Sequence, residues 1–218
     1  MAEHLTDEQQ EEQVKQWIKD NWFSIAAGLA LGFAGLFGWQ YYQKTQQQYN
    51  AEASAVYSQL TDALQKTDKD TTKATAEKLL TDFRDTAYAE FAALARAKVA
   101  IEEGDAEQAQ TQYEWVISNS KQAAVKNVAR LRLGRLLLAE GKLDNAITLI
   151  PSEDNAFNAE FAELKGDLML AKGDANAARD AYAKALAIMP VDAQERLNVQ
   201  QKLDDLAQPA DESNEATS

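Results

Sequence analysis

Two segments in the second half of the chain, LGRLLLAEGKLDNA at residues 133–146 and KGDLMLAKGDANAA at residues 165–178, match each other in register. Gly134 and Gly166 are as far apart as Gly141 and Gly173. A repeat of this length is typical of stacked helical hairpins. Each hairpin leaves an apolar face that a neighbouring hairpin buries. The sequence therefore predicts a solenoid.

Helical periodicity continues on both sides of this repeat, and short breaks at Gly or Thr/Asp turns divide it. No stretch alternates as a strand does. The fold class expected is all-α, with antiparallel helix pairs. The expected helices cover residues 44–66, 71–84, 86–103, 105–119, 122–140, 142–150, 155–172, 174–188 and 192–207. The last of them carries Leu197, Leu203 and Leu206 and should cap the final hairpin, while residues 208–218 should be disordered.

The composition argues against most kinds of catalysis and against nucleic-acid binding. The 218 residues include 22 Lys and Arg against 35 Asp and Glu, a formal net charge of −13, which repels a phosphate backbone. Cysteine is absent and His4 is the single histidine, so thiolate chemistry, His-based triads and two-His metal sites are excluded. No nucleotide-binding loop or hydrolase motif is present. We expect a protein that is not an enzyme and has no cofactor.

An uncharged run of 23 residues at 21–43 is long enough to cross a bilayer. As a helix it would span about 34 Å, against a hydrocarbon core of about 30 Å. Trp22 stands at one end and Trp39, Tyr41 and Tyr42 at the other, where aromatic rings favour the membrane interface. The alternatives are a buried core helix and a cleaved signal peptide. Residues 1–20 are acidic rather than short and positive, which favours an uncleaved transmembrane helix in the lipid bilayer.

Residues 1–20 are expected to form an acidic cytoplasmic tail, whose second half could be a short interfacial helix. Lys15 and Lys19 precede the apolar run and Lys44 follows it, so the positive-inside rule favours a cytoplasmic N-terminus only weakly. A cytosolic repeat domain is the alternative.

Small residues form a stripe on one side of the transmembrane helix: Ser24, Gly28, Gly32 and Gly35. Such a stripe lets another helix approach closely, so it is a candidate docking face for a membrane partner or a second copy. The alternative is that glycine is simply common in membrane helices.

Residues 44–207 resemble the tetratricopeptide family of 34-residue helical hairpins. Small residues and a proline occupy the family's key places in the last full unit, which carries Gly166, Ala178, Ala185 and Pro190, with Tyr182 at the aromatic place. An earlier unit has Ala97, Gly104, Ala109 and Tyr113, with Val116 in place of a small residue. The middle unit keeps Gly134, Gly141 and Ala146, but Pro151 cuts its second helix short. Residues 46–84 form a degenerate unit without glycine.

If this resemblance holds, the first helices of the hairpins line a concave protein-binding groove. Its expected residues are Phe91, Leu94, Lys98, Ile101, Val128, Leu131, Arg135, Leu138 and Leu170, joined by Glu160, Glu163 and Asp167. The groove would be apolar and weakly basic at first and acidic further on, a surface suited to partly unfolded polypeptide. The alternative is that these side chains pack on one another or on the cap.

The whole layout resembles the bacterial YfgM family of ancillary SecYEG translocon subunits. The resemblance lies in the acidic start with QVKQWIKDNW at residues 13–22, the single glycine-rich membrane helix and the repeat domain. It implies a single-pass inner-membrane protein with a cytoplasmic N-terminus and a periplasmic repeat domain. It also implies partners: SecYEG, the periplasmic chaperone PpiD, emerging secretory or membrane polypeptides and, through the tail, a cytoplasmic response regulator.

The primary hypothesis is a non-catalytic, membrane-tethered interaction module that helps pass emerging proteins to periplasmic chaperones. The rival hypothesis is a homo-oligomeric envelope scaffold that organises another membrane assembly.

Overall fold

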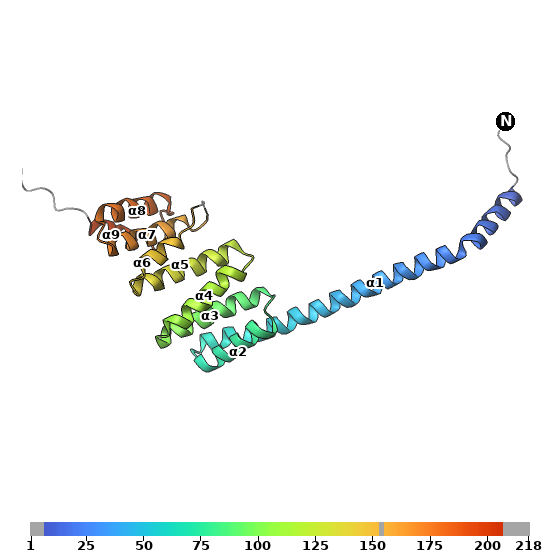
Figure 1. Cartoon of the computed structure of the whole chain (residues 1–218), viewed down its shortest axis with the longest axis horizontal. Coiled ribbons are helices and arrows are strands. Elements are labelled where there is room, and N and C mark those ends of the chain that lie inside the picture. The colour runs from blue at the N-terminus through green and yellow to red at the C-terminus, as the bar shows by residue number, and fades with distance from the viewer. Residues whose placement is uncertain (1–6, 153–154, 207–218) are drawn as a thin grey trace, which may run out of the picture. The chain divides into compact units, whose positions relative to one another are not determined.

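The computed structural model describes residues 7–152 and 155–206, and all regular secondary structure in these residues is helical. The expectations for His4 and for residues 208–218 lie outside the described residues. In chain order (Figure 1) the helices are α1 (Asp7–Gln65), α2 (Lys69–Asp82), α3 (Ala87–Glu103), α4 (Ala106–Asn119), α5 (Ala123–Ala139), α6 (Leu143–Thr148), α7 (Asn158–Ala171), α8 (Ala175–Ile188) and α9 (Arg196–Asp204).

The chain divides into two compact units between Glu52 and Ala53. The first unit holds the greater part of α1, and the second holds the end of α1 and helices α2 to α9. In the second unit α3 packs on α2 and α4, α5 packs on α4, α6 and α7, and α8 packs on α7 and α9. This order of contacts is that of consecutive hairpins in a solenoid.

Helix α1 joins three segments that the sequence analysis treats separately, namely the tail, the apolar run and the helix expected from residue 44. No glycine or proline lies between Trp39 and Gln65, so nothing in that stretch terminates a helix. Residues 7–20 are therefore helical rather than mostly an irregular tail. The end of α1 enters the repeat core through Ala53, Val56, Leu60 and Ala63, all of which are buried.

Three of the turns within the hairpins share one backbone geometry. Gly104, Gly141 and Gly173 have φ of +79°, +74° and +84°, the left-handed region that glycine adopts without strain. After each glycine, the next amide donates to a carbonyl five residues back, with N···O distances of 2.9 Å (Asp105 to Ala100), 2.8 Å (Lys142 to Leu137) and 2.9 Å (Asp174 to Met169). This bonding pattern is a Schellman turn, which satisfies carbonyls at the end of the first helix.

The residue after the turn glycine caps the second helix in two of these hairpins. The carboxylate of Asp105 accepts the amide of Gln108 at 3.0 Å, and that of Asp174 accepts the amide of Ala177 at 2.9 Å. Lys142 stands in the same place in the third hairpin, that of α5 and α6, and makes no side-chain cap.

The first hairpin, where a break without glycine was expected, makes the same left-handed turn with Thr67 in place of glycine. Thr67 has φ of +57°, and the amide of Asp68 donates to the carbonyl of Ala63 at 2.9 Å. The side-chain hydroxyl and the amide of Thr71 both donate to the Asp68 carboxylate, at 2.7 and 3.0 Å, and hold its pKa below the usual value. All four hairpins therefore share one turn.

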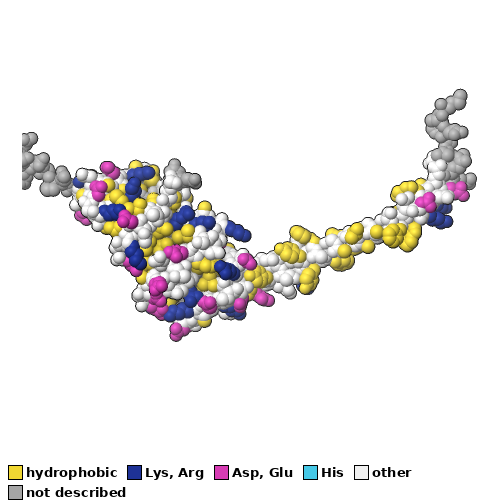
Figure 2. Space-filling view, viewed as in Figure 1, with side chains coloured by type: hydrophobic (Ala, Val, Ile, Leu, Met, Phe, Trp, Pro, Cys, Tyr) yellow, Lys and Arg dark blue, Asp and Glu magenta, His cyan; other side chains and the backbone are white. Residues whose placement is uncertain are grey.

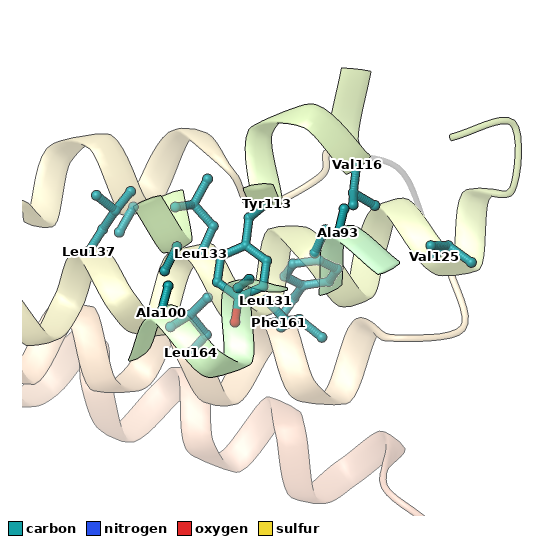
Figure 3. Close-up of a cluster of buried hydrophobic side chains, with 14 of the residues drawn as sticks. Ala93, Ala100, Tyr113, Val116, Val125, Leu131, Leu133, Leu137, Phe161 and Leu164 are labelled. Atoms are coloured by element: carbon teal, nitrogen blue, oxygen red, sulfur yellow. The ribbon is translucent and has the colours of Figure 1, made fainter. Parts of the chain in front are cut away.

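The main core lies between the first helices and the second helices that follow them. Figure 3 shows Tyr113, Val116, Leu133 and Leu164 meeting in a single cluster contributed by successive hairpins. A second cluster surrounds Tyr182, which is fully buried between α7, α8 and α9.

Small residues allow the closest helix contacts. A Cβ atom on Gly166 would lie 2.3 Å from Cε1 of Tyr182, and one on Gly134 would lie 2.6 Å from Cδ2 of Leu164. Ala97 occupies the equivalent place in the α3–α4 hairpin and is fully buried. The repeat glycines at these positions therefore lie in close helix contacts and not in turns.

Helix α9 caps the last hairpin, as expected, with two of the three leucines expected there and with Val199. Val199 is fully buried and Leu203 and Leu206 pack on the last core cluster. Leu197 is 73% exposed, so the expectation that it would help to cover the hairpin is wrong. Leu197 precedes Val199 by two residues, which places it on the opposite side of a helix.

Replacing Thr67 with glycine should stabilise the protein. A non-glycine residue in the left-handed region costs about 1–2 kcal/mol, part of which is offset by the greater freedom of glycine in the unfolded chain. We expect a gain of about 0.5–1 kcal/mol in the free energy of unfolding, measured with urea on the full chain in detergent. The converse change Gly173→Ala should cost about 1 kcal/mol, because no atom lies within 4 Å of its Cβ and only the backbone is strained. A Thr67→Gly protein that is less stable would contradict this account.

The two packing glycines should respond differently to alanine. Gly166→Ala forces the buried ring of Tyr182 to move and should cost about 1–3 kcal/mol of unfolding free energy. Gly134→Ala meets only a terminal methyl of Leu164, so the gain in helix propensity of about 1 kcal/mol should nearly cancel its cost. Thermal unfolding of both variants compares them directly. Equal losses of stability in the two variants would show that contact with the Tyr182 ring does not determine the cost of Gly166→Ala.

Candidate protein-binding surface

The expected groove residues fall into an exposed group and a buried group. Phe91, Ile101 and Leu170 are 37%, 43% and 44% exposed, so a partner can contact them. Ile101 and Leu170 each lie three residues before the turn glycine of their hairpins, and Phe91 lies ten residues before Ile101 on α3. We call these three side chains the exposed apolar row.

Four other expected groove residues belong largely to the core. Leu94 and Leu138 are half-buried and pack against the main core cluster, and Val128 is also half-buried. Leu131 is only 5% exposed and lies inside that cluster, so it offers no surface to a partner. Leu94 and Leu131 both stand ten residues before the turn glycine of their hairpins, so this place is covered in both.

An aromatic cluster adjoins the exposed apolar row and was missed by the sequence analysis. The ring of Tyr57 on α1 lies 5.1 Å from that of Tyr88 and 5.9 Å from that of Phe91, measured between centroids. Aromatic pairs at such distances are favourable beyond their buried area. The signal available was the register, because Tyr57 stands ten residues before Thr67, as Leu94 stands before Gly104.

The two cations expected in the groove, Lys98 and Arg135, are both exposed. The Lys98 side chain is 61% exposed, and its nearest carboxylate is that of Glu102 at 3.9 Å. The Arg135 guanidinium is 3.7 Å from the Glu163 carboxylate and is also exposed. Exposed pairs at these distances contribute little to stability. Both cations are therefore accessible to the carboxylates of a partner.

The acidic end of the expected groove is covered by the capping helix. Lys202 of α9 donates to Glu163 Oε1 at 2.8 Å and to the two Asp167 oxygens at 2.8 and 3.0 Å. The Tyr182 hydroxyl donates to Asp167 Oδ1 at 2.8 Å. Glu160 is half-buried beside them. The acids expected to face a ligand are thus largely engaged within the chain, which agrees with the packing alternative.

The pKa values in this network follow from burial and hydrogen bonding. Partial burial lowers the pKa of Lys202, but the hydrogen bonds and charges of Asp167 and Glu163 outweigh it and leave the pKa raised. Burial, followed by the hydrogen bond to Asp167, raises the pKa of Tyr182 well above its ordinary value. Lys202 therefore stays charged and keeps α9 on α7 across the physiological pH range.

One helix of the described chain is long and apolar enough to cross a membrane. Figure 2 shows apolar side chains along its surface, and Trp22, Phe33, Leu36 and Trp39 are all exposed. The stripe formed by Ser24, Gly28, Gly32 and Gly35 is exposed as well, and no atom of the chain lies within 4 Å of a Cβ built on any of the three glycines. The stripe is therefore open to a second helix.

Residues 7–152 and 155–206 contain no group of three or more carboxylate or histidine side chains able to hold a metal ion. The exposed apolar row and the accessible cations Lys98 and Arg135 are groups that can contact a protein.

Comparison with known proteins identifies the family. The family described as "Tetratricopeptide repeat-like domain" matches residues 15–208. An ancillary SecYEG translocon subunit of Haemophilus influenzae is 37% identical over 85% of this chain and 91% of its own length. A protein of the same name from Neisseria gonorrhoeae is 31% identical over 94% of this chain and 100% of its own length. One from Escherichia coli is 29% identical over 84% of this chain and 88% of its own length.

The family model covers the apolar helix and the repeats together, and with the relatives it confirms both resemblances found in the sequence. The chain belongs to the YfgM family of ancillary SecYEG translocon subunits and carries a tetratricopeptide repeat-like domain.

Proposed function

We propose that this protein is a non-catalytic ancillary subunit of the SecYEG translocon, anchored in the bacterial inner membrane by residues 21–43. Its N-terminus lies in the cytoplasm and its repeat domain in the periplasm, where it helps pass emerging secretory or membrane polypeptides to periplasmic chaperones. The observation that carries the proposal is the exposed apolar row of Phe91, Ile101 and Leu170, presented by a repeat domain on the same chain as an apolar helix.

The chemistry of this surface suits transient contact with partly unfolded chains. Apolar contacts tolerate many sequences, and Lys98 and Arg135 add attraction for carboxylates without a fixed partner geometry. Burial of a half-exposed aliphatic side chain contributes about 1 kcal/mol, so each contact is weak. Weak contacts allow rapid release, which a protein that transfers its client requires.

The membrane helix offsets this weakness. Tethering the surface beside its partner raises the effective concentration toward the millimolar range for a short linker. Contacts that would not persist in free solution are then populated at the translocon. Contacts with the chaperone PpiD at the repeat domain, and with a response regulator through residues 1–20, are further parts of this proposal.

Polar replacement of the exposed apolar row should weaken client binding without unfolding the domain. The double variant Phe91→Ser/Ile101→Ser removes contacts worth about 1–2 kcal/mol together, which corresponds to a loss of about five- to thirtyfold in affinity. Photo-crosslinking to a secretory chain stalled in SecYEG measures the loss. Val191→Ser/Leu197→Ser, which changes exposed apolar residues outside the row, is the matched control. Undiminished crosslinking of a folded Phe91/Ile101 variant would contradict the proposed role of this surface.

We further propose that the small-residue stripe packs on a membrane helix of the translocon. Leucine at Gly28, Gly32 and Gly35 would hold the two helices apart, so recovery of SecYEG with the purified protein should fall several-fold. Ala26→Leu/Ala30→Leu, on the opposite side of the helix, should leave recovery unchanged.

The same variants test the rival scaffold, in which the stripe joins copies of this chain. Light scattering in detergent gives the mass of the complex. A large homo-oligomer that the stripe variants convert to monomers, with SecYEG recovery unchanged, would favour the scaffold over the translocon subunit.

A further inference from the structure

The third hairpin, formed by α5 and α6, lacks most of its second helix. Helices α2, α4 and α8 each have 14 residues, whereas α6 has 6. Pro151 follows three residues after the end of α6, and its ring excludes a helical conformation at Ile150 and a helical hydrogen bond to Ile147. The hairpin is therefore short by about eight residues, or about 12 Å of helix.

In the other hairpins, the second half of the second helix covers the hairpin that follows, and this half is what α6 lacks. Tyr113 and Val116 lie in the second half of α4 and are buried in the core cluster that α5 and α7 share. Counted from the turn glycine, Ile150 corresponds to Tyr113 and to Tyr182, but it lies beyond the end of α6 and is only half-buried. The surface of α7 that a full second helix would cover is left without one.

A cleft of about 390 Å³ occupies this place. One wall is formed by Ile150, Pro151 and Ser152, and the other walls are formed by α7 and α8. Its α7 residues, such as Phe161 and Lys165, lie on the opposite side of that helix from Glu163 and Asp167. The cleft is therefore separate from the exposed apolar row and the network around Lys202.

The lining of the cleft combines an apolar floor with a basic rim. Phe161, Ala162 and Ala181 form the floor. Among the described residues that line the cleft, Lys165 and Lys184 are exposed at the rim and Asp180 is the one acid; neither lysine takes part in an ion pair with any described residue. An excess of positive charge is unusual in a chain of net charge −13 and favours an acidic ligand.

We propose that this cleft binds an acidic amphipathic helix of about two turns from a partner protein, which takes the place of the missing part of α6. The apolar face of such a helix would rest on Phe161 and Ala181, and its carboxylates would meet Lys165 and Lys184. The partner is a helix because the equivalent surface of the preceding hairpin is covered by a helix of this chain, α4.

Helix α4 supplies a probe for this proposal. A peptide with the sequence of residues 106–119, AEQAQTQYEWVISN, carries Tyr113 and Val116 on its apolar face and two glutamates on the other positions. Binding to the full chain in lipid nanodiscs is measured by fluorescence anisotropy, with empty nanodiscs as the blank. We expect saturable binding with a Kd on the order of 0.1–1 mM, because so short a peptide is mostly unfolded in water. A version with both glutamates changed to lysine should bind at least fivefold more weakly.

Three variants locate the site. Ala177→Trp fills the cleft and should abolish binding, and Lys165→Glu/Lys184→Glu should weaken it at least fivefold. The matched charge control, Lys78→Glu/Lys121→Glu, changes two exposed lysines that form no ion pair with described residues and should bind as the parent does. Circular dichroism verifies that each variant is folded.

Absence of saturable binding up to about 2 mM, or equal binding by the Ala177→Trp variant, would overturn the proposal. Loss of binding in the Phe91→Ser/Ile101→Ser variant would overturn it as well, because the peptide would then occupy the exposed apolar row. The client-binding role proposed above would survive the first two outcomes, since it depends on a different face of the repeat domain.

Discussion

The repeat domain depends on the turn that ends each first helix. At Thr67, Gly104, Gly141 and Gly173 the backbone enters the left-handed region, and a Schellman pair of hydrogen bonds reverses the chain within a few residues. Because the turn is the same in all four hairpins, equivalent residues meet equivalent residues along the stack. The close contacts at Gly134 and Gly166, the buried tyrosines and the alignment of the first helices all follow from this regularity.

The sequence predicts the fold well where a local pattern carries the information. Turn glycines, helix periodicity and the shortened third hairpin were all readable from spacing. The positive φ of Thr67 could not be predicted, because a β-branched residue rarely adopts positive φ and only the surrounding turn forces it to do so. The continuity of α1 was missed because the change from apolar to polar residues near position 43 was treated as a boundary, although composition alone does not end a helix.

The candidate surface was predictable only in part. Periodicity places Phe91 and Leu131 on the same face of the first helices, but tertiary packing leaves Phe91 exposed and buries Leu131 in the main core cluster. The engagement of Glu163 and Asp167 by Lys202 depends on contacts across more than 30 residues, which no local pattern encodes. The resulting surface is apolar with exposed cations, and its acidic end is closed by α9. A second face, opposite on α7, carries the cleft left by α6.

The account depends most on the repeat domain facing the periplasm on a single uncleaved membrane helix. Proteinase treatment of spheroplasts, followed by blotting for both ends of the chain, tests this directly. We expect protease to remove the repeat domain from intact spheroplasts and to leave a membrane-protected fragment that retains the N-terminus. A repeat domain that resists protease until the inner membrane is opened would place it in the cytosol and contradict the account.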